Sequence, residues 1–283
     1  MKESLSYQNG AKTAMDLIVY KPEAWQSHDR RTAVVFFYGG GFVKRNLKHF
    51  GQQSQFLAQK GYVCFCPDYR LTGQETEDIR DCFADGAAAL RQIKARSDEF
   101  GIDPKRIAVS GGSAGGALAC IAAMETGIPF CQVLFNPKLD MFSHRIHTVY
   151  RNEEEKKRAD RVPSPGHSSI ILSEEELTKI SACQRLETHK IPPTLLYVGD
   201  RDFLAFKDVI YFQYRADQLG LDCRTIVYSG EEHGFFNYYY SGELAGIADE
   251  KTEKRKFCYE DTLERLYTFI RQNEEAKKEA DSK

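Results

Sequence analysis

The clearest indication of the fold class is the sequence Arg106-Ile-Ala-Val-Ser-Gly-Gly-Ser-Ala-Gly-Gly-Ala117. It begins with the short apolar run of a buried strand, and an apolar helical stretch follows it from Ala117 to Met124. The glycine-rich piece between them therefore predicts a sharp turn from strand to helix around Ser113. Such a turn raises the Ser113 hydroxyl out of the sheet, and the glycines two residues to either side allow neighbouring chains to pack closely.

Two other interpretations of this turn compete with a reactive serine. A phosphate-binding loop needs Gly-Lys followed by Ser or Thr, whereas Gly116 is followed here by Ala117, so the sequence disfavours that interpretation. A purely structural glycine turn remains the other alternative. The reactive serine is favoured because the helix after the turn points its N-terminal amides at the hydroxyl, where they stabilise negative charge.

Strand and helix patterns alternate along the rest of the chain. Short apolar runs predict strands at Thr32–Tyr38, Tyr62–Cys66, Arg106–Val109, Pro129–Phe135, Thr194–Val198 and Cys223–Tyr228. Helical spacing predicts helices at Phe50–Gln59, Thr76–Arg96, Ala117–Met124, Ala205–Leu219 and Tyr259–Gln272. This alternation predicts an α/β fold with a mostly parallel sheet and helices on both faces. Leu5 to Tyr20, which alternates around Asn9-Gly10, predicts an antiparallel hairpin at the sheet edge.

The length of 283 residues fits one large domain or two small ones, and we expect a single domain over residues 1–283. Residues 138–190 break the strand–helix rhythm with a charge run, prolines and a short helix. They predict a short cap over the carboxyl edge of the sheet, where ligands bind in such folds, with a surface excursion as the alternative. The charged residues 273–283 predict a frayed tail.

Composition excludes several classes of protein. Thirty-nine basic against 41 acidic residues give a net charge of −2, which provides no electrostatic footprint for nucleic acid. No apolar run approaches the roughly 20 residues that a membrane span needs. Eight cysteines are too sparse for a disulfide scaffold, and no His or Cys cluster has a full set of metal ligands. We therefore expect a cytoplasmic chain without metal or cofactor, or else one exported by a signal peptide that has been removed.

A second glycine cluster, Tyr38-Gly39-Gly40-Gly41-Phe42, follows a predicted buried strand. Acyl transfer needs hydrogen-bond donors aimed at a developing oxyanion, and the amides of a glycine loop can supply them. In the G-x-S-x-G pattern one donor is the amide that follows the serine. The sequence thus predicts an oxyanion hole made of Gly40, Gly41 and Ala114.

A serine nucleophile in this pattern requires an acid and then a base further along the chain. Asp202 follows the strand that ends at Val198, and Asp200 is its nearest competitor. His233 follows the last strand in a glycine-flanked turn, a position that no other histidine of the chain occupies. We expect His233 to take the Ser113 proton and Asp202 to orient His233.

With these residues in this order, the chain resembles the α/β-hydrolases, and more narrowly the esterase/lipase branch related to hormone-sensitive lipase. The resemblance covers about residues 30 to 240 and includes Asp68-Tyr69-Arg70-Leu71, Gly101 to Ile107, Ser164-Pro165 and Ile191 to Thr194. It implies the α/β-hydrolase fold and a Ser-Asp-His triad. The chain departs from the branch at three places: Tyr38 replaces a histidine, Gly112 replaces an aspartate, and Thr72-Gly73-Gln74 replaces Ala-Pro-Glu.

The chain is also similar to a bacterial subgroup labelled carbohydrate acetyl esterase-like, which includes acetyl xylan esterase-like proteins. The similar residues include Leu134-Phe135-Asn136-Pro137 and His233-Gly234-Phe235-Phe236-Asn237. This similarity implies deacetylation of sugars. We therefore expect a serine carboxylesterase that acts on a small-molecule ester with a short acyl chain, with an acetylated sugar as a candidate substrate. A serine exopeptidase of the same fold and a non-catalytic ligand-binding protein are the alternatives.

Overall fold

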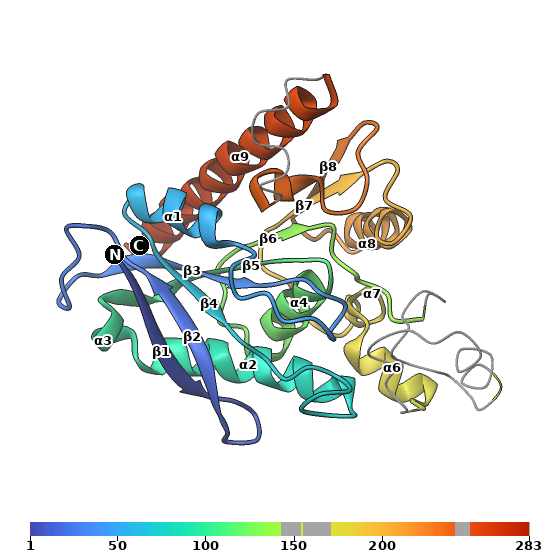
Figure 1. Cartoon of the computed structure of the whole chain (residues 1–283), viewed down its shortest axis with the longest axis horizontal. Coiled ribbons are helices and arrows are strands. Elements are labelled where there is room, and N and C mark those ends of the chain that lie inside the picture. The colour runs from blue at the N-terminus through green and yellow to red at the C-terminus, as the bar shows by residue number, and fades with distance from the viewer. Residues whose placement is uncertain (143–153, 155–170, 241–249, 283) are drawn as a thin grey trace.

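An eight-stranded sheet forms the centre of the computed structural model, which describes residues 1–142, 154, 171–240 and 250–282 (Figure 1). The strand order is β1-β2-β4-β3-β5-β6-β7-β8, and all neighbours from β4 to β8 pair in parallel. The strands are β1 (Lys2–Gln8), β2 (Ala14–Tyr20), β3 (Arg31–Phe37), β4 (Val63–Pro67), β5 (Ile102–Gly112), β6 (Gln132–Phe135), β7 (Thr194–Gly199) and β8 (Cys223–Tyr228).

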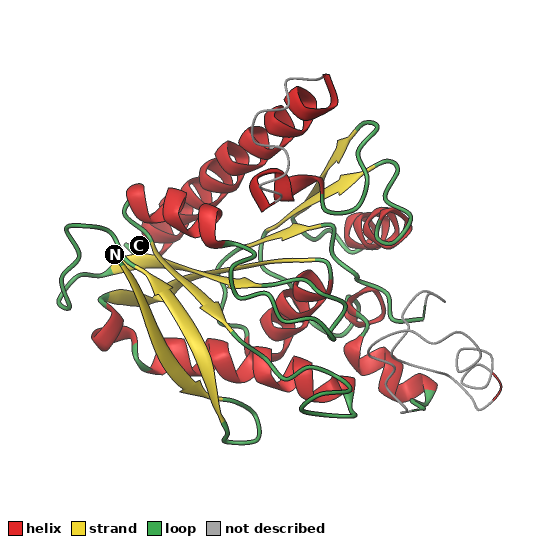
Figure 2. Ribbon diagram, viewed as in Figure 1, coloured by secondary structure: helices red, strands yellow, loops and turns green. Residues whose placement is uncertain are grey.

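Helices cover both faces of this sheet, as Figure 2 shows in red around the yellow strands. Side chains at alternate positions of a strand point to opposite faces. In β3, Val34 and Phe36 pack with α1 (Gly51–Gln59) and α9 (Glu250–Asp281), whereas Val35 and Phe37 belong to the core beneath α2, α4 and α8. The three helices on this second face are α2 (Ile79–Ala95), α4 (Ala114–Thr126) and α8 (Phe206–Gln218). The predicted α/β sheet with two helical layers is confirmed.

The predicted hairpin is also confirmed at the edge of the sheet. β1 and β2 pair antiparallel, with Leu5 opposite Leu17, and β2 continues antiparallel onto β4. The main differences from the predicted elements lie at strand and helix ends. β5 begins at Ile102 rather than Arg106, because residues with a turn-like composition still pair with β3 across a register shift.

The predicted frayed tail needs correction, because α9 continues to Asp281. Apolar spacing marks only the part of a helix that packs against the core, so the charged last turns carry no such pattern. Ion pairs four residues apart, Lys278–Glu274 and Lys277–Asp281, stabilise those turns. The hydroxyl of Tyr62 also donates a hydrogen bond of 3.2 Å to Glu274, which ties the helix to the start of β4.

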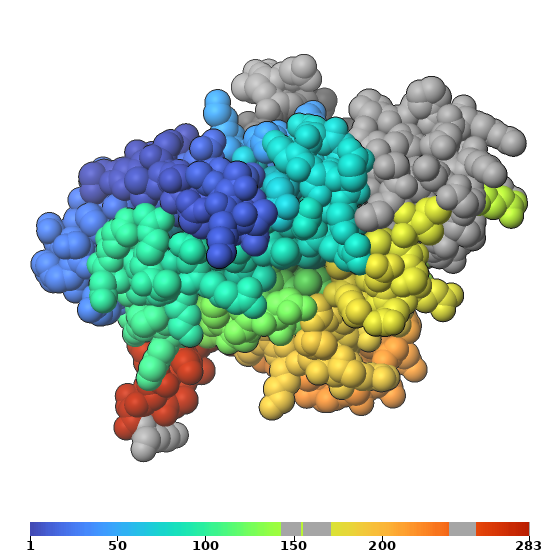
Figure 3. Space-filling model, turned by 90° about the horizontal axis from the view of Figure 1, so that it is seen from below, coloured from blue at the N-terminus to red at the C-terminus, as the bar shows by residue number. Residues whose placement is uncertain are grey.

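Most of the predicted cap, at residues 143–153 and 155–170, lies outside the described residues. Its described end contains two short helices, α6 (Glu174–Ile180) and α7 (Ala182–Arg185). Another short helix, α3 (Ser97–Phe100), lies outside this segment and precedes β5. A capping box of Ser173 and Glu176 starts α6, and Glu176 also pairs with Arg80 at the start of α2. Figure 3 shows the segment around α6, in yellow, on the surface, whereas the residues of α7 are mostly buried.

No helix within the described ranges combines the length and the apolar character that a bilayer span requires.

Candidate active site

Ser113 lies at the sharp turn between β5 and α4, with a φ of 55° and a ψ of −121°. Residues other than glycine rarely adopt this conformation, so the turn stores backbone strain. The flanking glycines are required by close packing rather than by flexibility. A Cβ atom on Gly115 would lie 2.2 Å from the carbonyl oxygen of Phe37, and one on Gly111 would lie 2.2 Å from the carbonyl oxygen of Gly115. The turn can therefore form only with glycines at these two positions.

Gly112, which stands where the esterase/lipase branch has an aspartate, touches an aromatic ring. A Cβ atom at Gly112 would lie 2.7 Å from Phe236 and 3.2 Å from Phe50. These two rings stack on one another with centroids 5.8 Å apart. The departure at Gly112 thus makes room for aromatic packing against the residue before Ser113.

His233 lies between Ser113 and Asp202. Its Nε2 atom is 2.9 Å from the Ser113 hydroxyl oxygen, and its Nδ1 atom is 2.8 Å from Asp202 Oδ2. A carboxylate only accepts hydrogen bonds, so Nδ1 carries the proton and Nε2 is left to accept the serine hydroxyl proton. Three residues that are far apart in the sequence meet here because β5, β7 and β8 all end at the same edge of the sheet.

Asp202 is buried, with 2% of its surface exposed, and its carboxylate has four partners. Oδ2 accepts hydrogen bonds from His233 and from Asn136 Nδ2, the latter at 2.7 Å. Oδ1 accepts the backbone amides of Leu204 and Ala205, both at 2.9 Å. Burial raises the pKa of Asp202, but the hydrogen bonds, with the one from His233 the strongest, hold that pKa below its usual value. The carboxylate therefore stays ionised beside the imidazole.

Asp200, the competing candidate for the acid, contacts the Gly230 amide and not the imidazole of His233. It is exposed, and its Oδ1 atom accepts a hydrogen bond of 2.6 Å from the Gly230 amide. This bond ties the loop after β7 to the turn after β8. The geometry therefore gives Asp200 a role in shaping the turn before His233, while Asp202 contacts His233 itself.

The three predicted oxyanion donors lie on two segments, the first residue of α4 and the glycine loop after β3. Ala114 opens α4, so its amide has no partner within the helix. The amides of Gly40 and Gly41 donate to no other described residue, while the Gly40 carbonyl accepts the amides of Val43 and Lys44. The glycine loop lies against the turn, because a Cβ atom on Gly39 would be 3.2 Å from the Ser113 Cβ.

His49 was not among the residues that the sequence predicts for the site. Its Nδ1 atom accepts a hydrogen bond of 2.8 Å from the Gly39 amide, and its Nε2 atom lies 2.8 Å from Asn237 Oδ1. Burial lowers the pKa of His49 to about 4, with the bond to Asn237 opposing this shift and the charge of His233 adding to it. Asn136, which donates to Asp202, was missed in the same way. Asn136 lies in the Leu134-Phe135-Asn136-Pro137 stretch, but that stretch does not indicate a contact with Asp202, and His49 lies in no motif quoted above.

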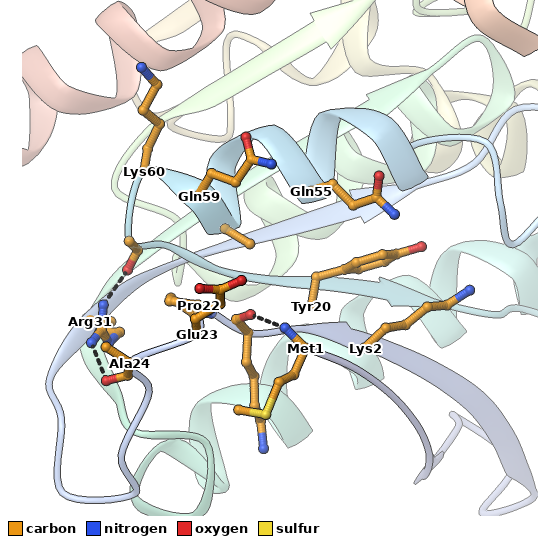
Figure 4. A pocket seen from close by; sticks show the side chains of 13 residues that line it. Met1, Lys2, Tyr20, Pro22, Glu23, Ala24, Arg31, Gln55, Gln59 and Lys60 are labelled. Carbon is orange, nitrogen blue, oxygen red and sulfur yellow. Dashed lines mark hydrogen bonds between the residues drawn. The ribbon is translucent and has the colours of Figure 1, made fainter.

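The pocket in Figure 4 lies at the opposite edge of the sheet from Ser113. It has a volume of about 760 Å³ and is bounded by the end of β2, the start of β3 and the end of α1. Tyr20, Lys2 and Lys60 are among its lining residues, and none of the predicted site residues is. Within the described residues, this pocket and the Ser113 site are therefore separate.

Comparison with known proteins places these observations in a family. The profile of a family described as alpha/beta hydrolase fold matches residues 34–237. A probable carboxylic ester hydrolase of Mycobacterium tuberculosis, LipM, is 40% identical over 103 residues, which make up 35% of this chain and 23% of that protein. The isoprenylcysteine alpha-carbonyl methylesterase ICME of Arabidopsis thaliana is 26% identical over 82% of this chain and 56% of its own length.

A solved structure is similar over nearly the whole chain. The propionate-bound esterase 2 of Thermogutta terrifontis superimposes with a TM-score of 0.72 and 26% identity, and covers 95% of this chain and 93% of its own. The curated relatives are longer, and this chain spans less than two thirds of LipM and of ICME. The esterase names agree with the resemblance to the esterase/lipase branch. By the match over residues 34–237 and the shared fold, the chain belongs to the alpha/beta-hydrolase family.

Proposed function

We propose that this chain is a serine carboxylesterase that hydrolyses short-chain acyl esters through an acyl-Ser113 intermediate. The observation that carries the proposal is the position of His233, 2.9 Å from the Ser113 hydroxyl and 2.8 Å from Asp202. A serine hydroxyl is a weak nucleophile at neutral pH and needs an adjacent base to take its proton. His233 is placed to act as that base, and the ionised Asp202 holds the tautomer that the reaction requires.

In the first half of the reaction, Ser113 Oγ attacks the carbonyl carbon of the ester while its proton moves to His233 Nε2. The negative charge that develops on the carbonyl oxygen is accepted by the amides of Gly40, Gly41 and Ala114. When the tetrahedral intermediate collapses, the bond to the alcohol oxygen breaks, and that oxygen receives the proton from His233. The alcohol leaves and the acyl group remains on Ser113.

In the second half, a water molecule attacks the acyl-Ser113 carbonyl carbon and gives its proton to His233. The same three amides accept the second oxyanion. The intermediate then releases the carboxylic acid, and Ser113 recovers its proton from His233. Asp202 stays ionised throughout and stabilises the imidazolium that forms twice in each cycle.

Two observations support a short acyl chain. The similar esterase of Thermogutta terrifontis has been solved with propionate and with butyrate bound. The resemblance to carbohydrate acetyl esterase-like proteins points to acetyl as the acyl group and to a sugar as the alcohol. We therefore expect acetate and butyrate esters to be hydrolysed faster than long-chain esters.

The first test is hydrolysis of p-nitrophenyl acetate by the wild type and by Ser113→Ala, with mass spectrometry after treatment with a fluorophosphonate. We expect turnover by the wild type, a loss of at least a thousandfold in the variant, and a single adduct on Ser113. A folded wild type with neither turnover nor adduct would instead favour a ligand-binding protein.

A substrate panel then tests the acyl and alcohol portions. p-Nitrophenyl esters from acetate to palmitate report the acyl preference, and a preference for palmitate would contradict the short-chain proposal. Acetylated glucose and acetylated xylan report the sugar proposal through the acetate they release. Aminoacyl p-nitroanilides test the exopeptidase alternative. Rapid cleavage of these substrates together with slow ester hydrolysis would favour an exopeptidase.

A further inference from the structure

His49 joins the glycine loop to the turn that carries His233. Its Nδ1 atom accepts the Gly39 amide at 2.8 Å, directly before the predicted oxyanion donors Gly40 and Gly41. Its Nε2 atom lies 2.8 Å from the side-chain oxygen of Asn237, four residues after His233. The two loops that must cooperate in acyl transfer are thus connected through one imidazole ring.

The hydrogen bonds fix which nitrogen of His49 carries the proton. The Gly39 amide only donates, so Nδ1 must be unprotonated. Nε2 of a neutral ring then carries the proton and donates it to Asn237 Oδ1. A protonated ring would lose the bond to Gly39, and burial holds His49 in its neutral form.

The ring of His49 is also held firmly by its neighbours. Phe50 and Phe236 pack against it, with centroid distances of 4.6 and 5.5 Å. Both phenyl rings also lie against Gly112, the residue before Ser113. The acceptor for the Gly39 amide is therefore fixed relative to the nucleophile turn as well as to the glycine loop.

We propose that His49 is a positioning residue for the oxyanion hole: its Nδ1 atom orients the Gly39 amide and so holds the next two amides in place. This inference rests on the proposed esterase function, and the buried His49 would act on the reaction only through the Gly39 amide. The amides of Gly40 and Gly41 act on a charge that exists only in the transition state. Loss of their orientation should therefore lower kcat and leave KM nearly unchanged.

Three substitutions separate the contributions of the bond to Gly39, the bond to Asn237 and the packing of the ring. In His49→Asn the side-chain oxygen takes the place of Nδ1, so it preserves the acceptor for Gly39. In His49→Gln the amide group takes the place of Nε2, so it preserves the donor to Asn237 and loses the acceptor. His49→Phe keeps an aromatic ring and removes both bonds. His28→Asn, at an exposed histidine, is the matched control.

We expect His49→Gln and His49→Phe to lower kcat about 10- to 100-fold toward p-nitrophenyl acetate at nearly constant KM, because small displacements of catalytic groups have effects of this size. His49→Asn should retain kcat within a few-fold of the wild type, and His28→Asn should match the wild type. Melting temperatures identify any variant that does not fold. If His49→Phe fails to fold, the comparison of His49→Asn with His49→Gln decides the question.

Several outcomes would overturn this inference alone. They are a His49→Gln variant with kcat within twofold of the wild type, a His49→Asn variant as impaired as His49→Gln, or losses that appear in KM rather than kcat. A folded wild type that hydrolyses no ester and forms no fluorophosphonate adduct is a different result. It overturns the proposed function, and the positioning role with it.

Discussion

The phenol of Tyr38 donates a hydrogen bond of 2.5 Å to the carboxylate of Asp68. Tyr38 begins the glycine loop at the position where the esterase/lipase branch has a histidine, and both side chains offer a hydrogen-bond donor. Burial raises the pKa of Tyr38, so the phenol remains protonated and can donate. Arg45 donates to the other oxygen of Asp68 at 2.7 Å, and Tyr69 stacks on Tyr38 with centroids 4.3 Å apart. The exchange of residue types therefore leaves the loop anchored.

Tyr38→Phe should destabilise the fold, because it preserves the stacked ring but removes a donor from a buried carboxylate. We expect a loss of about 1–3 kcal/mol in the free energy of unfolding, measured by urea denaturation. Tyr7→Phe is a matched control, since the Tyr7 hydroxyl donates to the neutral main-chain carbonyl of Asp68 at 2.6 Å. Its loss should be smaller, about 1 kcal/mol. Equal losses would show that the charge of Asp68 does not strengthen the bond to Tyr38.

Ser113→Gly should abolish hydrolysis and give a more stable protein than Ser113→Ala does. The φ of 55° at Ser113 strains a residue with a Cβ atom, and glycine relieves that strain. We expect the free energy of unfolding of Ser113→Gly to be about 1 kcal/mol larger than that of Ser113→Ala, which removes the hydroxyl but retains the Cβ. Thermal unfolding of the two variants measures this difference. Identical stabilities would mean that the turn stores no strain at this residue.

Asp202→Asn should reduce kcat/KM far more than Asp200→Asn does. Asp202 contacts His233 and fixes its tautomer, and loss of this function in a triad lowers the rate by about 10⁴-fold. Asp200 accepts only the Gly230 amide in a solvent-exposed position, so we expect its variant to remain within a few-fold of the wild type. Ester hydrolysis at neutral pH makes the comparison. A larger effect at Asp200 would reverse the assignment of the acid.

The stability of the wild type should fall in mild acid because of His49. The pKa of His49 is lowered from 6.5 to about 4 in the folded state, so the unfolded chain binds a proton between these values that the folded chain does not. The stabilising contribution of neutral His49 to the free energy of unfolding is thus fully present above pH 6.5. It decreases as the pH falls toward 4, by up to about 3 kcal/mol.

His49→Phe provides the comparison, since its residue 49 does not titrate. We expect its free energy of unfolding to fall less than that of the wild type between pH 7.5 and pH 4.5. Urea denaturation at the two pH values gives both differences. Parallel pH dependences would indicate that His49 titrates normally in the folded protein.

Local patterns predicted most of the fold and the residues of the candidate site. Ser113, the glycine loop and His233 each lie beside a strand in a motif whose backbone requirements limit the residue types. Helix ends were predicted less well. The C-terminal turns of α9 are held by ion pairs and by Tyr62 rather than by an apolar stripe, so hydrophobic spacing could not reveal them.

For other residues of the site, no local pattern indicates which group they contact. Asn136 and His49 are identified by contacts with residues distant in the sequence, at Asp202 and Gly39. A single asparagine or histidine side chain fits many environments equally well, and the stretch around Asn136 does not name its partner. Its partner becomes known only when the strands and loops around it are placed.

The order of strands and helices along the chain, the sharp turn at Ser113 and the two candidate loops can be predicted without a structure, because they depend on residue spacing and on where glycine is required. Only the folded chain shows which acid reaches His233, which group Tyr38 contacts and where His49 donates and accepts. These depend on distances of about 3 Å between groups on different loops, and hydrogen bonds weaken steeply with distance and angle. Such distances are set by the packing of the whole sheet and its helices, not by any one segment of the chain.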